Sequence, residues 1–207
     1  MNDTAGELAA VATDLFARHG YAGTSIRMIT DRAGANLGAI TYHFGTKEAL
    51  YEHVFDVMIE PLRPHMVAAV GPEGSPLDRI GRFVRALFQY LQRHPTLRRL
   101  IIQHLASNLP LLRSVRTTMQ GNIQHLAALI AEGQQDGSIR HGDPRLMALS
   151  IGSQPLFLSL MRQALLEGAA IDQDDLDTAR EIEDSVVQFV NAGLALNQRR
   201  SHEQQAK

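Results

Sequence analysis

The side chains best suited to act on another molecule lie in the short stretch 36–47. Thr41 and Tyr42 can hydrogen-bond the edge of a base or a phosphate oxygen, and Leu37 can contact the methyl group of thymine. Gly38 would let the backbone come close to a nucleic acid. These four residues stand at i, i+1, i+4 and i+5, so they share one side of a helix. The pattern predicts a surface that reads DNA.

Two short helices joined by a tight turn must position these side chains. Thr24 or Ser25 is a candidate N-cap of the first helix, since a hydroxyl there can accept from a free backbone N–H. Gly34 ends that helix, because glycine adopts the left-handed C′ conformation without a Cβ clash. Asn36 is the candidate N-cap of the second helix, which ends at Gly45, and the free N–H groups there suit a phosphate oxygen. This is the helix-turn-helix pattern, whose second helix enters the major groove.

Apolar residues at helical spacing indicate which sides of the two helices face inward. Ile26, Ile29 and Ala33 give the first helix one small apolar face. Ile40 and Phe44, four residues apart, do the same for the second helix. The opposite side, with Leu37, Gly38, Thr41 and Tyr42, is therefore expected to face solvent or DNA.

Two stretches, LFARHGYAGTSIRMI and AGANLGAITYHFGTKEALY, resemble the N-terminal DNA-binding domain of TetR/AcrR-type transcriptional repressors over roughly residues 5–55. In that family the segment after the turn glycine commonly reads small-apolar, Ser, Lys, Gly, Thr, Leu, Tyr, any residue, His and Phe, followed by a Lys-Glu pair. The matching residues are Gly34, Gly38, His43, Phe44, Lys47 and Glu48. The chain departs from the pattern at Asn36, Leu37 and Thr41, and its tyrosine is displaced to Tyr42. The departures bear on the base sequence contacted.

Residue types and the resemblance together indicate ten DNA-binding residues. They are Thr24, Ser25, Arg27, Asn36, Leu37, Gly38, Thr41, Tyr42, His43 and Lys47. A basic footprint is usual in DNA-binding proteins, yet the net charge is −2 and the first 50 residues hold four basic and five acidic side chains. Helix N-termini, Arg27 and Lys47 of a dimer can still contact phosphates. We therefore expect a modest salt dependence of DNA binding.

Composition narrows the class of protein. The 207 residues are 44% apolar and fit one domain or two small ones. No run of 18 apolar residues and no signal-peptide start occurs, so we expect a soluble cytoplasmic chain without membrane association. Without cysteine, disulfides and thiol chemistry are excluded. No Gly-x-Ser-x-Gly, phosphate-binding glycine loop or His-Glu-x-x-His motif indicates an enzyme, and no cofactor or metal is expected.

The acidic run DQDDLD at 172–177 suggests a calcium loop at first sight. However, Leu176 stands where an oxygen ligand is needed, and Asp177 replaces the turn glycine. Acidic residues at a helix start, which the helix dipole favours, explain the run better.

Helical periodicity continues to the end of the chain without an alternating strand pattern, so the predicted fold is all-α with nine helices. Helices are expected over 5–19, 24–33, 36–44, from 46 until Pro61 and Pro64 interrupt it, and over 76–93, 95–107, 110–136, 144–168 and 174–198. Ser75, Asp143 and Asp172 are the expected later N-caps. The expected domains are a three-helix helix-turn-helix domain at 1–47, a larger ligand-binding and dimerisation domain at 48–200, and a flexible tail at 201–207.

The last two long helices are apolar over more than one face. Either they are buried centrally, or one face packs on the core and the other on its twin across a two-fold axis. The resemblance favours the second alternative, because TetR-type repressors usually dimerise through a four-helix bundle of their last two large helices. The expected dimer residues are Leu156, Leu160, Leu165, Val186, Phe189, Val190 and Leu194. Two-fold symmetry suits a palindromic operator with half-sites about 34 Å apart or a multiple of that distance.

A small-molecule pocket between the middle helices is the other expectation. Its candidate lining is Met66, Phe88, His104, Met119, Leu126, Gln154, Phe157 and Met161. Apolar bulk with a few polar groups is the usual character of such pockets and suggests a lipophilic or amphipathic ligand. Pro155, inside a predicted helix, frees a backbone carbonyl that a ligand or water could use. The alternative is ordinary core packing.

The sequence therefore predicts a homodimeric repressor that binds double-stranded operator DNA and is released by a small-molecule effector. Release would be a population shift between states of different ligand affinity. The alternative is a helical sensor or carrier whose helix-turn-helix has lost DNA binding, which would agree with the acidic balance. A helical enzyme is a third interpretation, but the sequence offers no residues that would carry out a reaction.

Overall fold

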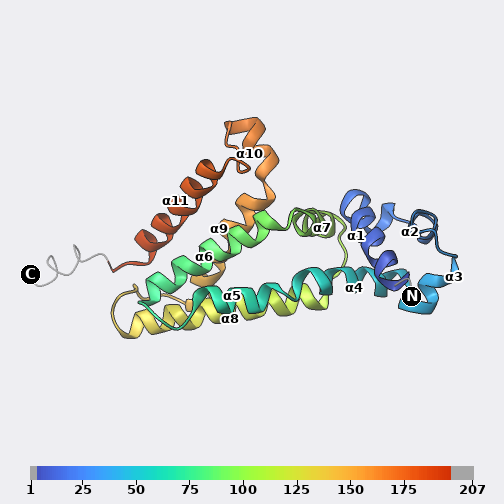
Figure 1. Ribbon diagram of the computed structural model, residues 1–207. Coiled ribbons are helices and arrows are strands. Elements are labelled where there is room, and N and C mark those ends of the chain that lie inside the picture. Colours follow the sequence, from blue (N-terminus) through green and yellow to red (C-terminus); the bar gives the residue numbers. More distant parts are fainter. Residues whose placement is uncertain (1–3, 197–207) are drawn as a thin grey trace, which may run out of the picture. The chain divides into compact units, whose positions relative to one another are not determined.

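The computed structural model describes residues 4–196, and this part of the chain is almost entirely helical (Figure 1). Its eleven helices are α1 (Thr4–Gly23), α2 (Ile26–Ala33), α3 (Gly38–Phe44), α4 (Lys47–Ile59), α5 (Leu62–Val70), α6 (Pro76–Arg93), α7 (Pro95–Ala106), α8 (Arg113–Gln135), α9 (Pro144–Leu160), α10 (Arg162–Ala169) and α11 (Leu176–Leu194). An isolated antiparallel bridge joins Ile139 and Ala195. The all-α prediction is confirmed. None of the described helices combines the length and apolar character needed to span a bilayer.

Local stop and start signals account for most helix boundaries. Ser25, Thr46, Ser75 and Asp143 are N-caps, and each side chain accepts the backbone N–H two or three residues further on. Gly34 takes the left-handed conformation, φ 65°, at the end of α2, as glycine does without steric cost. The predicted caps at Ser25, Ser75 and Asp143 and the predicted helix end at Gly34 are confirmed, because each depends on residues that are neighbours in the chain.

Two predicted N-caps are wrong. Leu37 precedes α3 without a side-chain cap, and Asn36 only accepts the N–H of Ala39 through its backbone carbonyl. Asp175, not Asp172, caps α11. The reason is position, since Asp175 has extended φ and ψ directly before the helix and can reach its first free N–H groups.

The described residues contain two helices more than the sequence predicts. The helix expected over 144–168 is interrupted at Met161, which has ψ 9° and divides α9 from α10. Pro155 lies inside α9 without ending it. Residues after Pro61 form the separate helix α5, which includes Pro64. Eleven helices in the described residues therefore replace the nine expected. The predicted tail at 201–207 lies outside the described residues.

The chain forms two compact units. Among the described residues, the first unit is made of 4–64 together with 91–119, and the second of 65–90 together with 120–196. α7 belongs with the N-terminal helices, because it packs on α1 and α4. The first unit therefore extends beyond the helix-turn-helix domain predicted for residues 1–47.

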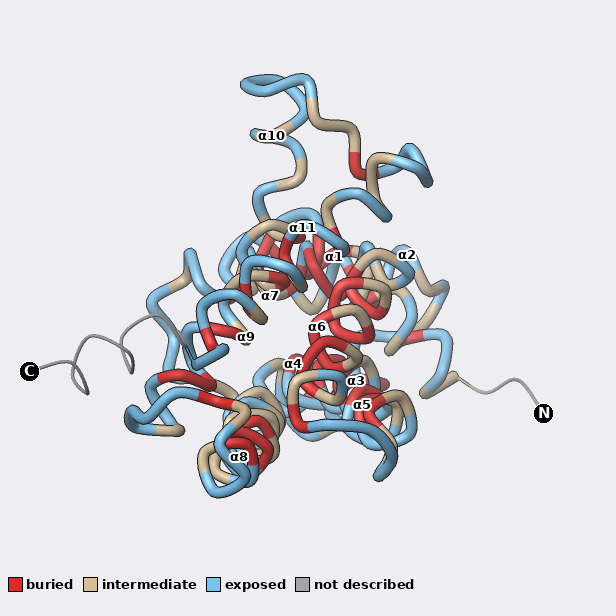
Figure 2. Tube along the Cα trace, turned by 90° about the vertical axis from the view of Figure 1, so that its left-hand side faces the viewer, coloured by how far each residue is buried: buried red, intermediate tan, exposed pale blue. Residues whose placement is uncertain are grey.

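Both units contain buried apolar side chains, and Figure 2 colours the buried residues red. Phe16, Ile40 and Phe55 are fully buried in the first unit. In the second, Phe83 on α6 and Ile130 on α8 are fully buried. Burial of such side chains is the main stabilising term of each unit.

Candidate DNA-binding surface

The helix predicted to contact DNA, α3, is held in place by the apolar side chains on its inner side. Ile40 is fully buried, Ala39 is buried, and Phe44 is half-buried. From α2, Ile29 is also fully buried. The inward orientation predicted for Ile40 is therefore present, and the opposite side of α3 is left for contacts with another molecule.

That opposite side presents every residue predicted for it. Leu37, Gly38, Thr41, Tyr42 and His43 are exposed, with Tyr42 84% and Leu37 61% accessible. Leu37, directly before α3, and Tyr42, on α3, are thus two large side chains that the packing of this unit leaves uncovered. The ring of His43 meets that of Tyr42 edge-on, with centroids 4.8 Å apart. A Cβ at Gly38 would approach only the Oδ1 of Asn36, at 3.4 Å, so the backbone here is open to close approach.

The predicted DNA-binding residues that precede the turn differ in how exposed their side chains are. Thr24 is buried, and its hydroxyl donates to the carbonyl of Gly20 at 2.8 Å, so it has a structural role and no free surface. The Ser25 hydroxyl caps α2. Arg27 is exposed and forms no ion pair within the described residues. Arg27 is thus the residue of this group best placed to neutralise a phosphate.

Lys47, the first residue of α4, is held by Tyr21. Its Nζ lies 4.1 Å from the centroid of the Tyr21 ring, a cation–π distance. The Tyr21 hydroxyl donates to the Glu48 carboxylate. Burial raises the pKa of Tyr21 to about 12, and the bond to Glu48 adds to this. Helical periodicity in the sequence gives no sign of this contact between Tyr21 and Lys47.

Electrostatics around the reading helix are nearly balanced. Asp14 pairs with Arg18 and with Arg32, each at 2.8 Å. The hydrogen bond from Arg18, with help from Arg32, lowers the pKa of Asp14, which stays ionised. Two of the four basic residues in the first 50 are thus occupied within the protein. In the described residues, Arg27 and Lys47 form no ion pair.

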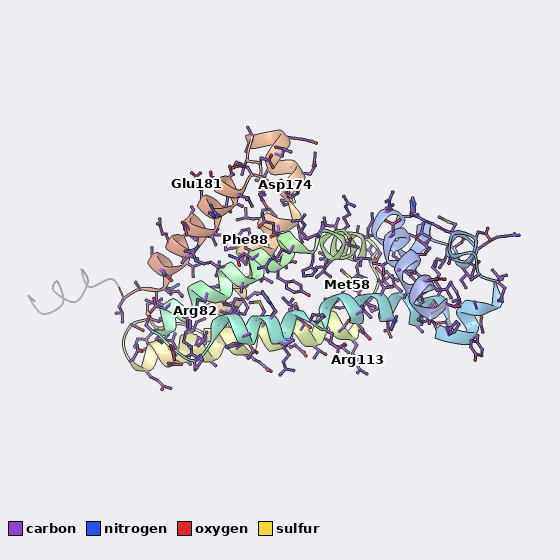
Figure 3. The ribbon with its side chains drawn as sticks, viewed as in Figure 1. Met58, Arg82, Phe88, Arg113, Asp174 and Glu181 are labelled. Carbon is purple, nitrogen blue, oxygen red and sulfur yellow. The ribbon has the colours of Figure 1, made fainter. Side chains whose placement is uncertain are left out.

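Residues 79–131 carry a basic charge that the sequence analysis missed. This stretch has no acidic residue, and its eight arginines are Arg79, Arg82, Arg85, Arg93, Arg98, Arg99, Arg113 and Arg116. Arg79 and Arg85 pair with Glu132 and Asp184 in the second unit. In the described part of the chain, Arg99, Arg113 and Arg116 are exposed without ion pairs; Figure 3 labels Arg113 at the start of α8. Counting charges by segment would have revealed this asymmetry.

The residues predicted to line a pocket are not all in similar surroundings. Met66, Phe88 and Leu126 are buried in the second unit, whereas Phe157 and Met161 are exposed. Gln154 is half-buried. His104 and Met119 belong to the first unit. His104 is buried against the rings of Tyr51 and Phe55.

The predicted dimer residues divide in the same way. Val186, Val190 and Leu194 on α11 are buried within their own chain, and Leu156, Leu160 and Leu165 are half-buried. Phe189 is 69% exposed. On α9, Leu146, Leu149 and Phe157 are exposed on one side at helical spacing. The sequence analysis did not include the first two, although their spacing from Phe157 could have identified them.

Helices with an exposed helix-turn-helix, as in the described residues 4–196, are typical of DNA-binding transcriptional regulators. Residues 8–54 match the family described as bacterial regulatory proteins of the tetR family, and residues 76–190 match a tetracyclin repressor-like C-terminal domain. The chain therefore belongs to the TetR family of transcriptional regulators.

Related proteins agree with this assignment. The chain is 28% identical to the HTH-type transcriptional regulator RutR of Escherichia coli K12 over 145 residues, which are 68% of this chain and 66% of RutR. It is 29% identical to the repressor KstR2 of Mycolicibacterium smegmatis over 137 residues, covering 65% of this chain and 66% of KstR2. The match thus spans just under two thirds of these relatives.

Solved structures share the fold over nearly the full length. A regulatory protein of the tetR family from Rhodococcus RHA1 superposes with a TM-score of 0.77 at 21% identity, covering 94% of this chain and 98% of that one. AibR, in complex with isovaleryl coenzyme A and operator DNA, superposes with a TM-score of 0.72 at 19% identity over 90% and 97% of the two chains. At these identities the likeness concerns the fold.

Proposed function

We propose that the chain is a homodimeric repressor that binds a palindromic operator through α3 and is released by a small-molecule effector. The observation that carries this proposal is the exposed face of α3, where Leu37, Thr41 and Tyr42 stand on a helix fixed by the buried Ile40. Arg27 and Lys47 supply phosphate contacts beside it. Thr41 and Tyr42 would contact base edges or phosphates, and Leu37 would contact the methyl group of a thymine.

Combined replacement of Thr41→Ala, Tyr42→Ala and Lys47→Ala should abolish specific DNA binding. Each lost base contact costs about 1–3 kcal/mol, so the triple variant should bind its operator at least about 100-fold more weakly. Fluorescence anisotropy with DNA flanking the protein's own gene, or with a selected operator, measures this loss. The exposed pair Thr117→Ala and Gln120→Ala on α8 is the control, and it should bind as the wild type does.

The same titration at several salt concentrations tests the charge assignment. With two basic side chains per protomer, a plot of log K against log salt should have a slope of about −4. Wild-type affinity retained by the triple variant would contradict the site. A wild type that binds no DNA but does bind a small molecule would favour the alternative, a sensor or carrier that has lost DNA binding.

Dimerisation is proposed through the outer faces of α9 and α11. Phe157 and Phe189 are 60% and 69% exposed on these helices, and exposed apolar surface of this kind marks an interface. Replacing both by aspartate should give a monomer, because each charge would be buried without a partner.

Sedimentation velocity at micromolar concentration measures this change. Leu105→Asp on α7, which is 61% exposed in the wild type, is the matched control and should remain dimeric. A monomeric wild type, or a dimeric double variant, would be inconsistent with the proposed interface.

The effector is proposed to be an anionic amphipathic compound. Support comes from the acid-free, arginine-rich stretch 79–131, together with the buried apolar side chains Met66, Phe88 and Leu126. AibR, which shares the fold, has been solved with an acyl coenzyme A. A charged head and an apolar tail would suit both features of this chain.

Isovaleryl coenzyme A is therefore a suitable probe, with free coenzyme A and an uncharged steroid as comparisons. At about 100 times its Kd a ligand adds about 2.7 kcal/mol of stability, so Tm should rise by about 5–10 °C. The acyl compound should also lower operator affinity. Stabilisation and DNA release by the steroid alone would contradict an anionic effector.

A further inference from the structure

A cation in the first turn of a helix is normally unfavourable, because the helix dipole is positive at that end. Lys47 is nevertheless the first residue of α4, directly after the N-cap Thr46. Its side chain is half-buried, with Nζ over the ring of Tyr21 at 4.1 Å. The electron-rich face of an aromatic ring attracts an ammonium group. The ring of Tyr21 therefore stabilises the Lys47 ammonium, which the helix dipole disfavours.

The Tyr21 ring cannot move freely. It stacks on Phe16 of α1, with centroids 6.2 Å apart and the planes inclined by 20°. It also contacts Tyr51 of α4 at 5.1 Å, and Tyr51 meets Phe16 edge-on at 4.8 Å. Phe16 and Tyr51 are buried. Tyr21 is thus the outermost ring of an aromatic cluster whose inner members belong to the core.

The hydroxyl end of Tyr21 holds the neighbouring acid. It donates a hydrogen bond to Glu48, and within the described residues no ion pair joins Glu48 to Lys47. This hydrogen bond is the main cause that lowers the pKa of Glu48. Burial lowers the pKa of Lys47, while the charge of Glu48 opposes that shift. Tyr21 therefore contacts both charged groups. It keeps the Glu48 carboxylate hydrogen-bonded to its hydroxyl and the Lys47 ammonium over its ring.

We propose that Tyr21 is a positioning residue for DNA binding, which presets the Lys47 ammonium for a phosphate and prevents Glu48 from neutralising it. The proposal rests on the proposed function, in which Lys47 contacts the DNA backbone. A long side chain loses rotamer freedom when it binds, and a side chain that is already ordered loses less. Tyr21 thus raises DNA affinity without itself touching DNA.

A double-mutant cycle separates this role from a purely structural one. Tyr21→Leu should weaken operator binding by at least about 5-fold in the dimer, because two Lys47 side chains must then be ordered on binding. In the Lys47→Ala background the same substitution should have less than about a two-fold effect, because the residue that it positions is gone. Equal losses in both backgrounds would overturn the proposal, since a packing defect acts whether or not Lys47 is present.

Tyr21→Phe provides the second comparison, because it keeps the ring and removes the hydroxyl. Freed from its hydrogen bond, Glu48 should pair with Lys47 and lower affinity. Adding Glu48→Gln should restore wild-type binding. No loss in Tyr21→Phe, or no recovery with Glu48→Gln, would overturn the role of the hydroxyl.

A measurement without DNA distinguishes failure of this inference from failure of the proposed function. In the free protein, the Lys47 side-chain protons should show an upfield ring-current shift by NMR, which Tyr21→Leu removes. Its absence would overturn the positioning whatever the protein binds. A normal ring-current shift in a wild type that binds no operator would instead refute the proposed function, and with it the DNA-binding role of Tyr21.

Discussion

The DNA-reading part of this protein depends on an aromatic cluster that joins three helices distant in sequence. Phe16 of α1, Tyr51 and Phe55 of α4, and His104 of α7 are all buried. Their rings meet at centroid distances of 4.8–5.9 Å, the range in which edge-to-face contacts stabilise beyond area burial. Tyr21 extends the cluster to the surface beside Lys47. Lys47, at the start of α4, is thus held beside rings that belong to the core.

The cluster also makes α7 part of the DNA-binding unit. The Tyr51 hydroxyl lies 3.3 Å from Nδ1 of His104, and burial lowers the pKa of His104, which favours the neutral ring in this core. The Gln103 side chain of α7 lies close to Gly20, whose φ of 68° kinks α1. Any displacement of α7 would therefore act directly on α1 and α4.

The sequence predicts features that depend on neighbouring residues and misses those that depend on distant ones. The caps at Ser25 and Asp143 and the left-handed Gly34 follow from local chemistry, and the structure contains them. The break at Met161 carries no glycine or proline signal, and the acidic run offers several candidate caps of which only Asp175 is used. The contact between Tyr21 and Lys47 spans two helices separated by the whole helix-turn-helix. Periodicity cannot predict such a contact.

The distribution of charge places the strongest constraint on where DNA can bind. The helix-turn-helix has few free basic side chains, whereas Arg99, Arg113 and Arg116 are exposed in an acid-free stretch of the same unit. Electrostatics alone would direct DNA to those arginines, whereas the proposed function has DNA bound at residues 37–47, through the exposed face of α3. Hydrogen–deuterium exchange with and without operator DNA distinguishes the two surfaces. We expect slower exchange on binding across residues 25–47, and slowing confined to residues 95–119 would contradict the reading role of α3.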